Sequence, residues 1–239
     1  MSRSLRALAI VLLAASCGGG SGTAPRNLDD ACSIANQRPE YIKAFQRTEK
    51  KWGVPVHVQM ATMHQESRFI SNAKTPHKYA LGVIPMGRVS SAYGYSQALD
   101  GTWDDYKRAT GKRVARRDRI RDASDFMGWY MNVSRSKNGI PLTDARNQYL
   151  AYHEGRTGFS RGTYNSKPWL LRVSAKVEER SQMYRGQLRR RGHAGQDDRA
   201  RRAHRHGPLR TGHPDQPDRH HAGHVQGGLG NVTGRASGR

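Results

Sequence analysis

The chain has 239 residues, carries a formal net charge of +22 and contains only two cysteines. This length allows one domain with its own hydrophobic core, or at most two small ones, and two cysteines exclude a disulfide-rich scaffold. The positive charge alone would suit a nucleic-acid binder, but the first residues indicate export, so we expect no nucleic-acid partner and an anionic cell envelope instead.

The first part of the chain, residues 1–17, has the features of a secretory signal. Arg3 and Arg6 form a short positive region, and the apolar run at 7–15 is too short to cross a bilayer as a mature helix. The sequence LAASC resembles a bacterial lipobox, in which Cys17 is lipidated and becomes the mature N-terminus. Cleavage by an ordinary signal peptidase is the alternative. We therefore expect an exported, periplasmic protein, anchored through a lipid on Cys17, with the outer membrane favoured.

Residues 18–37 are interpreted as a tether or linker, because they begin with a flexible run of glycine and serine. If Cys17 carries a lipid, Cys32 is left without a second cysteine in the chain. An odd cysteine in an exported protein indicates either a partner or a reactive thiol.

Hydrophobic periodicity predicts a mainly α domain over residues 38–188. Apolar residues recur at helical spacing in six segments, and little of the domain alternates as a strand does. The predicted helices cover residues 38–52, 55–67, 100–110, 122–137, 143–152 and 168–188. Residues 70–90 lack periodicity and form a long loop or small lobe, in which YALGVIPM is a candidate strand.

Polar residues and glycines mark the ends of these helices. Asp122 and Thr143 are the expected N-caps of the fourth and fifth helices, since short polar side chains accept hydrogen bonds from the first turn. Gly53, Gly111 and Gly139 are expected to end the helices that precede them.

The composition changes at about residue 189. The helix before this point, 168–188, is predicted to place Trp169 on its buried side. Residues 189–239 hold seven of the eleven histidines and no aromatic residue, lysine or glutamate, so they cannot bury enough surface to fold. We expect a disordered tail, whose composition also suits a shifted reading frame. Its histidines lack metal-ligand spacing, so no metal is expected there.

A single carboxylate, Glu66, stands at the end of the predicted helix 55–67. Met63 and Phe69 lie close to it in sequence, and the helix is apolar on most of its surface. A carboxyl group in such a setting titrates high, because desolvation disfavours the charged form. A carboxylic acid that stays protonated near neutral pH can donate a proton. A salt-bridged or exposed glutamate is the alternative, and is the commoner case.

Three short motifs follow one another along the chain. They are Glu66-Ser67 within HQESRF, Gly94 to Gln97 within SSAYGYSQ, and Tyr152 within AYHEG. In this order they resemble the soluble lytic transglycosylase (SLT) domain, related to goose-type lysozyme, which shows ES, GLMQ and AYNxG. The resemblance covers about residues 38–188. It implies a lysozyme-like single domain with a small loop lobe, which cleaves the β-1,4 bond between N-acetylmuramic acid and N-acetylglucosamine.

The resemblance also assigns roles by motif position. It implies that Glu66 is the single catalytic acid and base, that Ser67 helps to orient it, and that Tyr152 lies near it at the reacting sugar ring. Gly94 and Gln97 are then expected to line the sugar-binding site.

The chain departs from the family pattern beside these positions. Tyr95 and Ser96 replace leucine and methionine, and the rings of Tyr93 and Tyr95 become candidates for stacking on sugars. His153 replaces the asparagine of AYNxG, where it either supplies the same hydrogen bond or responds to pH near 6.5. Glu154 follows it, and both are further candidates for substrate contact.

The number of carboxylates decides between two reactions. Most glycosidases use two, but one acid suffices if the substrate supplies the attacking group, here the C6 hydroxyl of the muramic acid, which closes a 1,6-anhydro ring. This reaction needs no cofactor and no metal. A second carboxylate near Glu66 would allow hydrolysis by water, as in a muramidase. Glu154 is the main candidate, whereas Asp100 and Asp104 are expected in capping and surface roles.

The sequence therefore predicts a lytic transglycosylase that acts on the glycan strands of peptidoglycan as a monomer. A hydrolytic muramidase is the alternative within the same class. An inactive peptidoglycan-binding lipoprotein and, on charge alone, a nucleic-acid binder are the alternatives from other classes.

Overall fold

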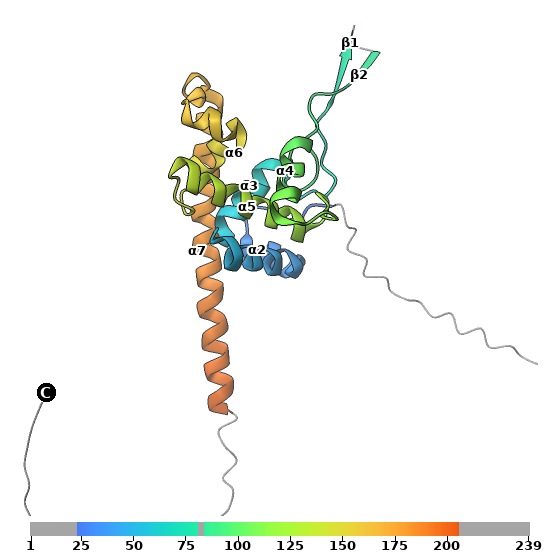
Figure 1. Ribbon diagram of the computed structural model, residues 1–239. Coiled ribbons are helices and arrows are strands. Elements are labelled where there is room, and N and C mark those ends of the chain that lie inside the picture. Colours follow the sequence, from blue (N-terminus) through green and yellow to red (C-terminus); the bar gives the residue numbers. More distant parts are fainter. Residues whose placement is uncertain (1–22, 81–83, 206–239) are drawn as a thin grey trace, which may run out of the picture. The chain divides into compact units, whose positions relative to one another are not determined.

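The computed structural model describes residues 23–80 and 84–205 (Figure 1). The chain divides into two units, 1–198 and 199–239, and the packing described below belongs to the first. The predicted signal, the lipidation site at Cys17 and most of the predicted tail lie outside the described residues. None of the helices in the described ranges combines the length and apolar character needed to cross a membrane.

The described residues form seven α-helices, one short 3₁₀ helix and one two-stranded sheet, which confirms the mainly α prediction. In chain order the elements are α1 (Ala31–Gln37), α2 (Pro39–Trp52), α3 (Val56–Ser67), β1 (His77–Ala80), β2 (Ile84–Arg88), α4 (Asp100–Thr110), α5 (Ile120–Asn138), α6 (Ala145–Ser160), η1 (Thr163–Ser166) and α7 (Pro168–Arg205).

The strands β1 and β2 pair antiparallel in the region predicted to be a loop lobe. They include most of the candidate strand, and their register is irregular between His77 and Tyr79. Figure 1 shows this hairpin extending away from the helices. The hydrophobic core described next is built mainly by the helices.

The core lies where α2 packs along α5, with α3 against both. Gly128 of α5 permits this close approach, because a Cβ atom there would lie 2.4 Å from Cγ2 of Thr48 and 2.6 Å from Cδ1 of Trp52. On the other side of α5, Trp103 and Tyr106 of α4 pack against the buried ring of Phe126. Aromatic rings of α4 and α5 therefore form part of the core on this side.

A buried polar network fixes α3 within this core. The side-chain amide of Gln59 donates hydrogen bonds to the carbonyl oxygens of Val54 (2.7 Å) and Phe45 (3.0 Å). Its oxygen accepts one from the hydroxyl of Ser124 on α5 (2.9 Å), which is also bonded to Thr48 on α2 (2.7 Å). Because buried polar groups are costly unless they are paired, this network specifies how α3 sits between its neighbours.

Helix α1 was not predicted, and it lies inside the segment 18–37 that was expected to be a linker. Asp30 caps it by accepting hydrogen bonds from the amides of Cys32 (2.8 Å) and Ser33 (3.1 Å). The side chain of Gln187 on α7 accepts another from the amide of Ala31 (2.7 Å). A helix of seven residues is too short to show periodicity, and this one depends on its contacts with α7.

Several helix ends differ from the predictions. Helix α5 begins two residues before Asp122, and Asp144 rather than Thr143 caps α6, accepting a hydrogen bond from the amide of Asn147 (2.9 Å). Helix α6 also continues beyond Tyr152, through a kink at Gly155. Gly155 has φ 75° and ψ 157°, a non-helical conformation open to glycine, so α6 consists of two helical segments that meet at this residue. The helices before Gly53, Gly111 and Gly139 end as predicted.

Helix α7 differs most from its prediction. It continues past Leu188 to Arg205, because the residues that follow Leu188 are rich in arginine and alanine, which favour helix. Its buried side is formed by Leu170, Val177 and Tyr184. Trp169, predicted on that side, is instead 48 % exposed.

Candidate active site

Glu66 lies in the last turn of α3, whose other residues are mostly buried. The helix ends because Arg68 and Phe69 adopt left-handed backbone conformations, with φ of 52° and 62°. Phe69 is fully buried after this turn, so the end of α3 is fixed in the core while Glu66 keeps a partly exposed side chain.

Burial raises the pKa of Glu66 to about 7, and a hydrogen bond with Tyr149 acts in the opposite direction. The sequence predicts this high titration. At neutral pH such a carboxyl group is protonated in a large fraction of molecules, and it becomes a base once it has lost its proton.

Two tyrosines of α6 stand beside Glu66. Tyr149 is 4 % exposed, and its side chain is hydrogen-bonded to the Glu66 carboxyl. The hydroxyl of Tyr152 donates to the carbonyl oxygen of Ser96 (2.6 Å). Burial, and after it the charge of Glu66, raise the pKa of Tyr152 well above its ordinary value.

Sequence reasoning missed Tyr149. The residue precedes Tyr152 by three positions, so both lie on the same face of α6. That spacing was the available signal, but the family motif begins only at Ala151, after Tyr149.

The turn from Gly94 to Gln97 joins α3 to α6 through its backbone carbonyls. Ser67 donates its hydroxyl to the carbonyl oxygen of Tyr95 (2.8 Å), and Tyr152 binds the carbonyl of the next residue. Ser67 therefore holds the end of α3 against the turn. Its contribution to the orientation of Glu66 is indirect, through the position of that helix end.

Gly94 is required at the start of this turn. Its φ is 78°, and a Cβ atom there would lie 2.3 Å from the carbonyl oxygen of Arg117. The side-chain amide of Gln97 donates to the carbonyl oxygens of Gly94 (2.8 Å) and Ala73 (3.0 Å). The Gln97 amide group therefore stabilises the turn from within.

The two tyrosines expected to stack on sugars lie in different surroundings. The ring of Tyr95 is 6 % exposed, and its hydroxyl is bonded to that of Tyr41 (2.9 Å), so it belongs to the core. This placement corrects the prediction for Tyr95, because the turn directs the ring inward. Tyr93 is partly exposed, and the cationic groups of Lys74 and Arg117 lie 5.6 and 5.5 Å from its ring centre.

Glu154, the candidate second carboxylate, is held in an ion pair. Its side chain is 4 % exposed, and both of its oxygens lie 2.8 Å from the ammonium of Lys167. The hydroxyl of Thr163 donates to it at 2.5 Å, and a ring nitrogen of His153 lies 3.1 Å away. Burial opposes its charge, but these partners lower the pKa of Glu154 to about 2. It is therefore ionised and paired at neutral pH.

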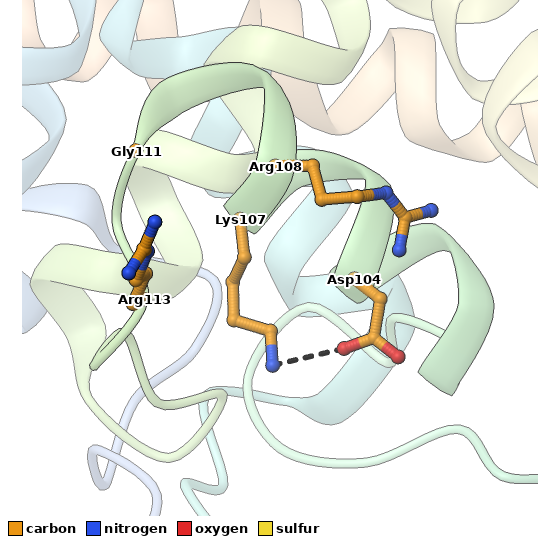
Figure 2. A pocket seen from close by; sticks show the side chains of 5 residues that line it. All are labelled: Asp104, Lys107, Arg108, Gly111 and Arg113. Atoms are coloured by element: carbon orange, nitrogen blue, oxygen red, sulfur yellow. Dashed lines mark ion pairs between the residues drawn. The ribbon is translucent and has the colours of Figure 1, made fainter.

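Asp100 and Asp104 also have cationic partners. Asp100 pairs with Arg117 (2.7 Å), and Asp104 pairs with Lys107 (2.9 Å). Figure 2 shows the second pair in a pocket of about 430 Å³ on α4 and the loop after it. The other lining residues are Arg108, Gly111 and Arg113. None of them belongs to the group around Glu66, so this pocket is a separate feature.

Comparison with known families assigns the chain. The family model described as the transglycosylase SLT domain matches residues 5–190, which include all three motifs. Comparison with curated proteins and with solved structures gives no match. The match covers well over half of the chain, and the helices that it spans hold Glu66, the Gly94–Gln97 turn and Tyr152 together. The chain therefore belongs to the transglycosylase SLT domain family, whose members act on peptidoglycan.

Proposed function

We propose that this protein is a lytic transglycosylase that cleaves the β-1,4 bond between N-acetylmuramic acid and N-acetylglucosamine and leaves a 1,6-anhydro ring on the muramic acid. The observation that carries the proposal is the state of Glu66. Its pKa is raised to about 7 by burial, and it is hydrogen-bonded to Tyr149. Such a group can first donate a proton and then accept one.

In the first step, Glu66 gives its proton to the glycosidic oxygen. The bond from this oxygen to C1 of the muramic acid breaks, and its electron pair leaves with the N-acetylglucosamine. The positive charge that develops at C1 is stabilised by the sugar's own acetamido group. The hydrogen bond from Tyr149 stabilises the carboxylate that Glu66 becomes, because donors favour the charged form of a carboxyl group.

In the second step, the Glu66 carboxylate removes the proton from the C6 hydroxyl of the same muramic acid. The oxygen bonds to C1 and closes the 1,6-anhydro ring, while Glu66 returns to its protonated form. No water is consumed, and one residue serves both steps.

The surroundings of Glu154 favour this reaction over hydrolysis. Hydrolysis with inversion or through a glycosyl-enzyme needs a second free carboxylate. Glu154 is buried in an ion pair with Lys167, and its lowered pKa makes it a weak base. Glu66 is then the group that carries the chemistry.

The other motif residues take supporting roles in this proposal. Ser67, Gly94 and Gln97 set the position of the turn beside Glu66, and Tyr152 joins that turn to α6. Tyr93, which immediately precedes the turn, is partly exposed and remains a candidate for contact with a sugar.

We also propose that the protein works in the periplasm, with a lipid on Cys17 as its anchor. The support is the signal-like sequence before Cys17 and the action of the family on the cell wall, which lies outside the cytoplasmic membrane.

Substitution Glu66→Gln tests the proposal. The amide has the same shape but cannot donate or accept the proton, so we expect release of glycan fragments from isolated sacculi to fall by about 10²- to 10⁴-fold, with binding to sacculi retained. Glu49→Gln, which changes an exposed glutamate of α2, is the matched control and should leave the rate unchanged. Turnover by Glu66→Gln at the wild-type rate would contradict the proposal.

A further inference from the structure

Trp169 is the second residue of α7, and nearly half of its side chain is exposed, at 48 %. Single exposed apolar residues are common and need no explanation by themselves. Trp169 differs because its ring is supported on one side. The ring of His153 on α6 meets it edge to face, with 5.2 Å between ring centres and 78° between planes.

His153, which contacts Trp169, is connected through Tyr149 to Glu66, the proposed acid. His153 follows Tyr149 by four residues, so both lie on one face of α6, and their ring centres are 6.5 Å apart. Tyr149 is in turn hydrogen-bonded to Glu66. An unbroken series of contacts therefore runs from Glu66 through Tyr149 and His153 to the exposed indole.

The indole is also held in place from both sides along the chain. Lys167, two residues earlier, is bound to both oxygens of Glu154 on α6 at 2.8 Å. Leu170, the next residue, is fully buried in the core. An aromatic ring that is fixed before a ligand arrives loses little conformational freedom on binding, which favours affinity.

We propose that Trp169 is a sugar-binding residue of the site around Glu66, where its exposed ring stacks on a pyranose ring of the glycan strand and His153 positions it. The proposal rests on the proposed function. Pyranose rings present flat faces of C–H groups, and an indole offers a large apolar face for them together with an N–H donor at its edge. The ligand is thus a sugar unit of the strand some distance from the bond that is cleaved.

This role gives a reason for His153, which replaces the asparagine of AYNxG, and for Glu154 beside it. Glu154 forms the ion pair that holds the start of α7 against α6, and His153 supports the ring. Both residues then act through Trp169, and neither takes part in proton transfer.

The test uses the Glu66→Gln protein, which binds without cleaving, and measures its affinity by calorimetry for glycan strands stripped of their stem peptides. Adding Trp169→Ala should weaken binding by about tenfold, which corresponds to the loss of one well-placed aromatic contact. Trp169→Phe should restore most of the affinity, because it keeps an aromatic face. Val114→Ala is the control, since Val114 is 86 % exposed and lies on the loop between α4 and α5.

A second readout separates binding from chemistry. In the protein with Glu66 intact, Trp169→Ala should raise KM by about tenfold and leave kcat nearly unchanged, as expected for a contact made equally in the ground and transition states. Equal affinity of the Trp169→Ala and parent proteins would overturn the inference and leave the proposed function standing. If the Glu66→Gln protein binds no strands and the unsubstituted protein releases no products, the proposed function fails as well.

Discussion

Glu66 can act as an acid and then as a base because two opposing influences meet at its side chain. Burial at the end of α3 disfavours its charge, and the hydrogen bond from Tyr149 favours it. The balance leaves its pKa at about 7, so neither form is costly to reach near neutral pH. Tyr149 thus sets the acidity of the group that we propose transfers the proton.

Replacement of Tyr149 by phenylalanine should therefore shift the pH profile. The change removes a donor that lowers the pKa of Glu66, so that pKa rises above about 7. Because the first step needs protonated Glu66, activity is lost as pH rises through this pKa, and the basic limb of the profile should move to higher pH. The rate at its maximum should fall by about 10- to 100-fold, since the carboxylate loses a charge-assisted hydrogen bond.

The control for this experiment is Tyr152→Phe. The hydroxyl of Tyr152 donates to the carbonyl oxygen of Ser96 and not to Glu66, so the basic limb should stay near its wild-type position. A limb that moves to lower pH in Tyr149→Phe, or that moves equally in both variants, would show that Tyr149 does not set the pKa of Glu66.

At the residue level, the sequence predicted the features that depend on short motifs and on the local apolar pattern. Short motifs single out Glu66 and Tyr152 as candidate site residues, and the place of Glu66 on an apolar helix predicts its high pKa. The burial of Tyr95, the contact of Tyr149 with Glu66 and the exposure of Trp169 depend on how separate elements face one another. No local pattern carries that information.

Among the elements, the turn Gly94–Gln97 is the one that most strictly requires a particular residue, the glycine at position 94. A Cβ atom at Gly94 would lie 2.3 Å from the carbonyl oxygen of Arg117. The φ of Gly94, 78°, is also unfavourable for any residue with a side chain. Gly94→Ala should therefore lower the free energy of unfolding by about 2 kcal/mol or more, measured by chemical denaturation. Gly87 has φ 86° but open space around its Cβ position, so Gly87→Ala isolates the cost of φ alone. Equal effects of the two changes would show that the contact with Arg117 is unimportant.

The ion pair between Glu154 and Lys167 should stabilise the junction of α6 and α7. In Lys167→Met the buried carboxylate loses its main partner, and we expect a loss of about 1 to 3 kcal/mol at neutral pH, less than for a fully buried pair because Lys167 is 39 % exposed. Since the pKa of Glu154 is lowered to about 2, its contribution is present above the ordinary pKa of 4.5 and is lost as pH falls through about 2.

Thermal unfolding across this pH range checks the ion pair. The difference between wild type and Lys167→Met should shrink as pH falls from 5 towards 2. Lys107→Met breaks the more exposed pair with Asp104 and should change stability little. A difference that is the same at all pH values would mean that Lys167 acts through its packing and not through its charge.

Helix prediction succeeded where a long apolar face ends at a glycine. Helices α2 and α4 begin and end within about a residue of prediction for this reason. Helix α3 does so as well, although Arg68 and not a glycine ends it. Helix α1 was missed because its seven residues depend on α7 for their contacts. Helix α7 passes Leu188, because a change in composition need not end a helix, whereas the helical backbone of α6 is interrupted at Gly155 and resumes after it.

For the molecule as a whole, the packing of α3 determines where the acid stands. Gln59 ties α3 to α2 and α5, and His57 is bonded to the hydroxyl of Ser181 on α7 (2.8 Å). Glu66 at the other end of α3 then meets Tyr149 on α6. The sequence predicted a mainly α domain, but the pairing of helices rests on buried polar contacts between residues far apart in the chain.

The nature of the released ends tests the central proposal most directly. Sacculi digested by the wild-type protein, with Glu66→Gln as the control, can be analysed by mass spectrometry. If Glu66 serves as both acid and base, the muramic acid ends are 1,6-anhydro rings, lighter than hydrolytic ends by one water, and the control releases almost none. Fragments that carry reducing muramic acid ends would contradict the proposal and would show that water is the attacking group.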